Sequence, residues 1–385
     1  QYVAGYSGQA NALGPIPGVP IVPATRSETY PAGGTNYGYI AGGDPTSAGG
    51  TYIYRIDFDS DTTTAAPKGN LYVSRKSNSE GAVGNGSYGY FCGGWSPGHI
   101  SSIDRMDYGN DTATATPKGN LANPGNNWAA AGNTNYGWIT AGESPSTGYM
   151  TSINRMDYSS DTGTTVRGNT DNYTRLGTAG NLSYGYWAGG QSPKTSRTVR
   201  LDYSNDTTWG TTKGPLNASK YNVEGAGNAN YGYFAGGSTG VPSTDPSVVD
   251  RLDYSNDTAT ASPKGNLSAK MSDDAATANG SYGYFAPGPS GQPDKRSMDR
   301  IDFANDTATA SPRGNIINDA DNRMGTSSRE NGLPTTAPGP VTIDKGARVS
   351  TVLDDVYEEE RRSSGLIFSG IYNTNSGVNN LNQFI

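Results

Sequence analysis

Cysteine and histidine are almost absent from this sequence. Cys92 and His99 are the single examples of each among 385 residues. One cysteine excludes an intramolecular disulfide, and one histidine excludes the zinc and copper sites that are built from paired histidine ligands. We expect no catalytic metal and no cofactor, with His99 an exposed loop residue and Cys92 a small packed hydrophobic residue.

Charge and long apolar runs are also scarce. Only 16% of the residues are charged, and the formal net charge of −7 argues against a nucleic-acid partner, because Lys and Arg supply most phosphate binding. No apolar run approaches the roughly 18 residues of a membrane span, so we expect no membrane insertion. No phosphate-binding loop precedes an expected helix, and no nucleophile motif lies at an expected strand-to-helix turn. These absences favour a protein that is not an enzyme.

Glycine, proline and aromatic residues are abundant instead. The chain has 54 Gly and 23 Pro but only 33% hydrophobic residues, which predicts many turns. Disordered chains contain few aromatic residues, whereas 10% of this chain is Phe, Trp or Tyr. The composition therefore favours an ordered all-β protein.

A sequence repeat runs through most of the chain. A Tyr-Gly-Tyr or Tyr-Gly-Trp element begins at six positions: Tyr37, Tyr88, Tyr136, Tyr184, Tyr231 and Tyr282. The intervals between them are 51, 48, 48, 47 and 51 residues. Units of this size with four short strands are typical of β-propeller blades, so we predict a closed six-bladed ring.

The fifth unit shows the four expected strands most clearly. Its segments are Tyr231–Gly237, Val249–Tyr254, Thr258–Ser262 and Ala269–Met271. Asn256 and Asp257 tolerate left-handed backbone, which predicts a tight turn between the second and third segments.

These units resemble the kelch repeat, whose first strand ends in a pair of glycines. Four units carry the pair: Gly42 and Gly43, Gly93 and Gly94, Gly189 and Gly190, Gly236 and Gly237. The tryptophan expected after the turn is mostly replaced by Ala or Thr, with Trp209 the nearest match. The resemblance implies a kelch-type propeller over residues 23–331.

The chain outside the repeat is divided by composition. We expect an N-terminal extension at residues 1–22, a linker at residues 332–340 and a C-terminal segment with a short helix at residues 341–385. Residues 23–36 are expected to supply the fourth strand of the blade that begins at Tyr282. Residues 321–331 compete for that place, and a seventh partial blade stays open.

Spacing within the repeat separates constant from variable parts. From the recurring Arg (Arg55 in the first unit) to the next recurring basic residue (Lys68) the gap is 13 residues in five units and 12 in the third. Asp57 and its equivalents follow the Arg by two residues on the same strand face, which predicts repeated Arg–carboxylate pairs of the scaffold. The loop before the Arg varies in length, so its end of the ring is the expected ligand face.

Candidate ligand-binding residues lie in these variable loops. They are Trp95, His99, Glu143, Tyr149, Gln191, Lys194 and Asp245. Aromatic, amide and acidic groups together suit recognition of a glycan.

The C-terminal segment suggests an assembly role. Its last residues, 369–384, and the Asp-Tyr-Ser-Asn-Asp-Thr repeats resemble virion structural proteins of marine tailed phages, especially cyanophages. Apolar residues there need burial against another protein, so we expect an assembly contact through Val349, Leu353, Val356, Phe368 and Phe384. The resemblance implies a tail fibre or appendage component located in the virion, with other virion proteins, further copies of the chain and a host glycan as partners. A secreted or cell-surface lectin-like protein of a microbe and a polysaccharide-acting propeller enzyme stay open as alternatives.

Overall fold

The computed structural model describes most of the repeat region and two short strands near the C-terminus. The described residues are 36–43, 50–77, 81–140, 142–144, 146, 148–241, 246–272, 275–286, 296–317, 322–327, 368–371 and 380–384. The six expected Tyr-Gly elements all lie in this part of the chain.

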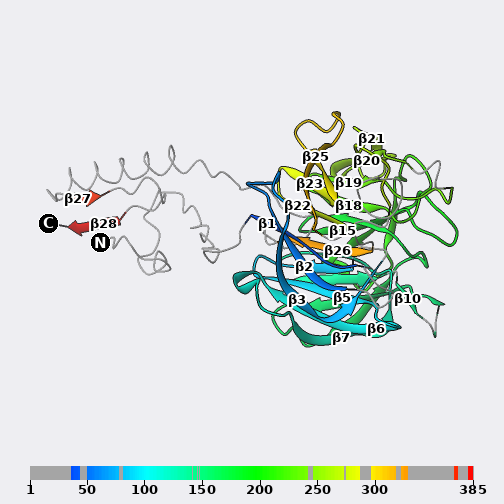
Figure 1. Ribbon diagram of the computed structural model, residues 1–385, viewed down its shortest axis with the longest axis horizontal. Helices are drawn as coiled ribbons and strands as arrows, with labels where there is room; N and C mark the ends of the chain where they lie inside the picture. Colours follow the sequence, from blue (N-terminus) through cyan, green and yellow to red (C-terminus); the bar gives the residue numbers. More distant parts are fainter. Residues whose placement is uncertain are drawn as a thin grey trace, which may run out of the picture. The chain divides into compact units, whose positions relative to one another are not determined.

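Six four-stranded antiparallel sheets form the blades of a ring, numbered here in chain order and given from the inner to the outer strand (Figure 1). Blade 1 consists of β26 (Arg323–Ser327), β1 (Tyr37–Gly42), β2 (Gly50–Asp57) and β3 (Ala66–Arg75). Blade 2 consists of β4 (Ala82–Gly84), β5 (Tyr88–Trp95), β6 (His99–Asp107) and β7 (Thr116–Gly125). Blade 3 consists of β8 (Ala129–Gly132), β9 (Tyr136–Thr140), β12 (Ser152–Asp157) and β13 (Thr164–Asn169).

The second half of the ring repeats this order. Blade 4 consists of β14 (Gly177–Gly180), β15 (Tyr184–Ala188), β16 (Thr198–Asp202) and β17 (Thr211–Lys213). Blade 5 consists of β18 (Glu224–Gly227), β19 (Tyr231–Ala235), β20 (Val249–Asp253) and β21 (Ser262–Pro263). Blade 6 consists of β22 (Ala275–Ala278), β23 (Tyr282–Ala286), β24 (Ser297–Asp302) and β25 (Ser311–Asn315). The protein is thus an all-β, six-bladed β-propeller, as the repeat predicts.

Short inner strands built from small residues close the ring. Each inner strand contacts the inner strands of both neighbouring blades, in the cyclic order β26, β4, β8, β14, β18, β22. A Cβ placed on Gly225 of β18 would lie 1.8 Å from the carbonyl oxygen of Thr178 in β14, so only glycine allows this approach. The Ala, Gly and Thr content of these strands therefore sets how closely six sheets converge.

The blade begins one strand earlier than the sequence suggests. The sequence interpretation placed Tyr231–Gly237 first and Ala269–Met271 last, but Ala269–Met271 forms no strand. The missing strand is β22, which pairs with the following Tyr282 strand. The tyrosine strand is therefore the second strand of each blade, counted from the axis.

The closing strand comes from the end of the repeat region. β26 pairs with β1, so the last described strand of the ring completes the first blade, and Figure 1 shows orange β26 beside the blue strands of that blade. The expectation that residues 23–36 complete the blade of Tyr282 is wrong, because β22 to β25 already fill it. Residues 321–331, the competing candidate, contain the closing strand, although it joins a different blade. Residues 23–35 lie outside the described part of the chain.

Apolar cores lie between neighbouring blades. Each of the six clusters of buried residues draws on two adjacent sheets; one holds Tyr39 and Ile53 of blade 1 together with Phe91 and Met106 of blade 2. An aromatic ring of one blade stacks on a ring of the next at each of the six junctions, as Tyr186 does on Tyr254 with centroids 4.9 Å apart. Tyrosine supplies the apolar area that Leu and Ile supply in most cores.

A buried aspartate in each turn joins its blade to the preceding one. Asp257 of blade 5 accepts hydrogen bonds from Tyr186 (2.9 Å) and Arg200 (2.7 Å) of blade 4, and its other oxygen lies 3.0 Å from the Lys213 ammonium. The ion pairs recur around the ring at Asp61, Asp111, Asp161, Asp206 and Asp306. We call these six carboxylates the clamp aspartates.

The recurring Arg therefore pairs with a different carboxylate from the one expected. Arg55 was paired with Asp57 two residues later, but its guanidinium binds Asp111 of the next blade. Asp57 instead accepts a hydrogen bond from the backbone N–H of Asp59 at 3.0 Å and caps its own turn. The expected left-handed turn is also wrong for Asp257, whose φ is −72°, because a short 3₁₀ turn, η4 (Tyr254–Asn256), precedes it.

The two ends of the ring differ in what they carry. The turn end holds the clamp aspartates, and the loop end holds the variable connections from the second to the third strand of each blade, as expected. The pairing of Gly38 with Ser327 places the start of β1 and the end of β26 together at the turn end. Both flanking segments of the chain therefore leave the ring at the end opposite the variable loops.

The expected helix in residues 343–362 lies outside the described residues. Further along, β27 (Phe368–Ile371) and β28 (Asn380–Phe384) pair as antiparallel strands. None of the described helices is long and apolar enough to cross a membrane.

Candidate functional site

The loop end brings the predicted ligand-binding residues into two groups. The first group is the β5–β6 hairpin of blade 2, where the rings of Trp95 and His99 meet edge to face with centroids 4.9 Å apart. Both side chains are half-buried. The hairpin is held by two backbone hydrogen bonds between Trp95 and Lys76, and by the Ser96 hydroxyl 2.9 Å from that of Ser74.

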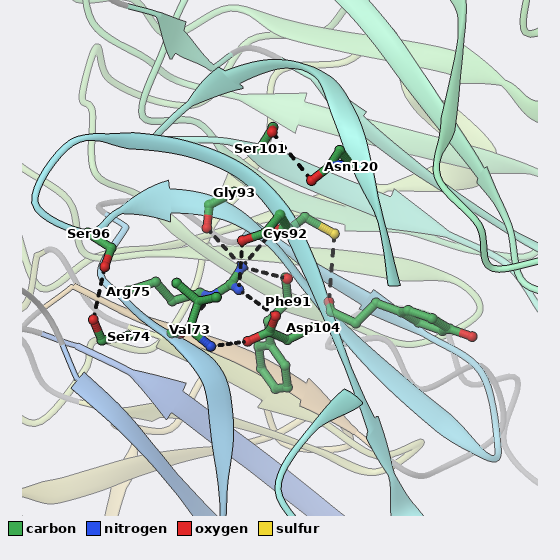
Figure 2. A network of polar contacts seen from close by, with 12 residues as sticks. Val73, Ser74, Arg75, Phe91, Cys92, Gly93, Ser96, Ser101, Asp104 and Asn120 are labelled. Atoms are coloured by element: carbon green, nitrogen blue, oxygen red, sulfur yellow. Dashed lines mark hydrogen bonds and ion pairs between the residues drawn. The ribbon is translucent and has the colours of Figure 1, made fainter. Parts of the chain in front are cut away.

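A buried ion pair supports this hairpin from below. Figure 2 shows the Arg75 guanidinium bound to the Asp104 carboxylate, 2.8 Å away, and to the carbonyls of Phe91 and Gly93. Both charged side chains are fully buried. Burial lowers the pKa of Arg75, and the Asp104 charge opposes that shift. Breaking such a pair costs about 3–5 kcal/mol, so it fixes the hairpin relative to blade 1. Sequence analysis missed Arg75, which lies outside the recurring basic positions.

The second group extends over blades 3, 4 and 5. Glu143 and Tyr149 face each other across a small hairpin of β10 (Glu143–Ser144) and β11 (Gly148–Tyr149), and the Glu143 carboxylate accepts from the Asn127 amide at 3.2 Å. The Ser192 hydroxyl of blade 4 donates to the Tyr149 hydroxyl at 2.8 Å. Lys194 donates to the backbone carbonyl of Thr239 in blade 5 at 2.6 Å.

These bonds tie three successive loops into one rim. The backbone N–H of Gln191 donates to the Thr174 carbonyl at 2.9 Å, which fixes the base of the blade 4 loop. The side chains that link the loops include Ser192, which the sequence analysis did not single out, since one serine in a polar loop gives no distinguishing pattern. Asp245 lies outside the described residues.

The chemistry of the loop end is that of a polar recognition surface. Tyr149 is 39% exposed and carries both an aromatic face and a hydroxyl. Cys92 is buried as expected, and burial raises the pKa of its thiol to about 12, so it holds no reactive thiolate at neutral pH. Among the described residues, no three His, Cys, Asp or Glu side chains gather in a way that could hold a metal ion.

The fold defines the class of protein, a six-bladed β-propeller. Neither a protein-family model nor a curated protein sequence matches this chain.

Proposed function

We propose that this protein is a non-enzymatic structural component of a phage virion, a fibre or appendage protein whose loop end binds the host surface. The observation that carries the proposal is the direction of the chain. Both flanking segments leave the ring at the turn end, beside Gly38 and Ser327. A molecule attached through those segments leaves its variable loops free to meet a ligand.

The ring itself supports a display role. Six clamp aspartates repeat one contact around the ring, so the blades form a stiff scaffold, whereas the loops break the symmetry. Binding residues are commonly found on loops that a rigid scaffold positions. The hydrogen-bonded rim of Tyr149, Ser192 and Lys194 holds its polar groups in place, as recognition of a glycan requires.

The sequence resemblances give the proposal its setting. The ring is consistent with the kelch-type resemblance, and the Asp-Tyr-Ser-Asn-Asp-Thr repeats resemble those of cyanophage virion proteins. Residues 341–385 then form the assembly segment, through contacts with other virion proteins or further copies of the chain. A secreted or cell-surface lectin-like propeller would use the same loop end but would need no assembly segment.

Two variants of the full chain test the proposal separately. Deletion of residues 341–385 is expected to leave a folded ring that fails to enter particles, measured by its content in purified virions. Tyr149→Ala is expected to enter particles normally but reduce their adsorption to host cells about tenfold, because it removes a ring and a loop-to-loop hydrogen bond. Exposed Tyr72, on the outer strand of blade 1, offers the control Tyr72→Ala. Normal incorporation of the deleted chain would contradict the assembly role, and unchanged adsorption of Tyr149→Ala would contradict the loop-end role.

A further inference from the structure

The turn of blade 3 lacks a residue that the other five blades use to seal a junction. In those blades a backbone N–H in the hairpin donates to a carbonyl of the preceding blade at 2.7–2.9 Å. The donor and acceptor pairs are Ala65 and Asn315, Ala115 and Asn70, Gly210 and Asn169, Ala261 and Pro215, and Ala310 and Asn266. The corresponding carbonyl facing blade 3 is that of Asn120. The blade 3 hairpin is one residue shorter, 12 instead of 13 between its basic residues, and supplies no such N–H.

A side chain replaces the missing backbone donor. The Thr164 hydroxyl lies 3.3 Å from the Asn120 carbonyl and 3.3 Å from the Asn154 side-chain oxygen. The backbone also changes, because φ is 41° at Asp161, whereas the equivalent Asp257 has a φ of −72°. Gly163, with a φ of 145°, completes the altered turn.

A cleft of about 460 Å³ lies at this turn, bordered by blade 2 and the blade 3 hairpin. It is lined by Asn120, Arg155, Asp157, Ser160, Thr162, Gly163, Thr164 and Thr165. The volume falls in the range of small-molecule sites. The turn end, which spacing alone describes as uniform, therefore has one position that differs from the other five.

The lining favours a neutral ligand with many hydroxyl groups. Asp206 binds the Arg155 guanidinium at 3.0 Å, so that positive charge is already balanced. Asp157 accepts the N–H and hydroxyl of Ser159 through one oxygen, and these bonds lower its pKa, which keeps it an ionised acceptor at neutral pH. Amide, hydroxyl and carboxylate groups together offer both donors and acceptors, as sugar hydroxyls require.

An exposed indole lies on the other side of the same outer strand. Trp209 is 60% exposed and occupies the position that is Thr64, Thr114, Thr260 and Thr309 in four other blades. Its backbone bridges to Asn169, four residues or about 13 Å along β13 from Thr165 in the cleft. Exposed Val166 lies between them in sequence. An indole face packs well on the C–H face of a sugar ring, so the strand offers a polar and an apolar subsite.

We propose that the blade 3 cleft and Trp209 form a binding site for a short neutral saccharide. The site lies at the turn end, so it is separate from the loop-end surface, and it does not depend on the virion assignment. It arises where a one-residue deletion and a Thr-to-Trp difference fall on neighbouring blades of an otherwise repeated scaffold.

Titration of the full chain with a panel of neutral mono- and disaccharides, followed by calorimetry or ligand-observed NMR, tests the site. Wild-type protein is expected to bind at least one member of the panel, Asn120→Ala to weaken that binding at least tenfold, and Trp209→Thr to weaken it about fivefold. Asn70→Ala changes the equivalent asparagine of the sealed blade 1 to blade 2 junction and is expected to bind like wild type. Insertion of one alanine between Gly163 and Thr164 restores the spacing of the other blades and should abolish binding.

The readout separates this site from the loop end. Tyr149→Ala is expected to leave saccharide binding at the cleft unchanged, and thermal melting identifies any variant that fails to fold. Absence of binding across the panel overturns the proposal, as does equal weakening by Asn120→Ala and Asn70→Ala. Binding that Tyr149→Ala alone abolishes would move the saccharide site to the loop end, and capture of a protein partner lost in Trp209→Thr, without saccharide binding, would make the patch a protein interface.

Discussion

A single carboxylate per blade explains why one spacing in the repeat is constant. Arg200 and Lys213 stand at the two ends of one hairpin of blade 4, and both reach Asp257 of blade 5. A change in hairpin length would move one of the two cations away. The sequence shows that these charges belong to the scaffold, but not which carboxylate they bind, because the partner lies about 50 residues away, on the next blade.

Asp257 and Asp253 give a matched comparison at this scale. Asp257→Ala leaves Arg200, Lys213 and the Tyr186 hydroxyl without their acceptor, so we expect the free energy of unfolding to fall by about 3 kcal/mol. Asp253→Ala removes only the acceptor for the backbone N–H of Ser255, 2.9 Å away, and should cost about 1 kcal/mol. Urea unfolding followed by tyrosine and tryptophan fluorescence measures both, and equal losses would contradict the clamp.

The same carboxylates predict how stability depends on pH. Burial would raise the pKa of Asp257, but hydrogen bonds from Lys213 and Tyr186 and the charge of Arg200 bring it below the ordinary value of 3.8; Trp138 and Arg167 act likewise on Asp206. A lowered folded-state pKa means that the unfolded chain binds more protons, so this stability is present above about pH 4 and is lost as pH falls through the folded-state values. Melting temperatures between pH 7 and pH 2 should show that fall. Asp257→Asn should show a shallower one, and a parallel curve for this variant would contradict the assignment.

At the scale of the strand, the sequence predicts the aromatic strands well and the inner strands poorly. Tyr231–Ala235 alternates large side chains toward two apolar cores, which is the pattern that identifies a strand. Ala275–Ala278 is buried on both faces and holds only Ala and Thr, so it has neither alternation nor the bulk that favours strands. Its position depends on the neighbouring inner strands, which a single repeat does not contain.

Gly225→Ala tests the close approach of the inner strands. Its added methyl group would overlap the Thr178 carbonyl, and a backbone neighbour cannot move aside without displacing β14, so we expect a loss of about 3–5 kcal/mol. Gly109→Ser is the control, because Ser204 and Ser255 occupy the same turn position in blades 4 and 5. Thermal melting of both variants gives the comparison. A Gly225→Ala protein as stable as Gly109→Ser would show that the inner strands have room that the structure denies them.

At the scale of the molecule, the number of blades could be predicted from the sequence, whereas the way the ring closes could not. Six Tyr-Gly elements at nearly equal intervals require six similar units. The closing strand, Arg323–Ser327, has no Tyr-Gly element after it, because the strand it pairs with lies about 285 residues earlier. The candidate binding surfaces follow the same division: the loop end is visible as variable spacing, but the blade 3 cleft requires the position of the Asn120 carbonyl.

Two truncations test the closure, because the ring depends on β26 for more than its hydrogen bonds to β1. Met324 packs in the core between blades 1 and 2, the Thr326 hydroxyl lies 2.9 Å from that of Tyr108, and the Thr326 carbonyl accepts from Thr277 of blade 6. A chain that ends at Ser327 keeps these contacts, so we expect it to unfold cooperatively near the temperature of the full chain. A chain that ends at Asp321 exposes the inner edge of β1 and both adjoining cores, and should lose cooperative unfolding and aggregate. Differential scanning calorimetry with light scattering distinguishes the two outcomes, and a cooperative, monomeric transition in the shorter chain would show that the ring closes without this strand.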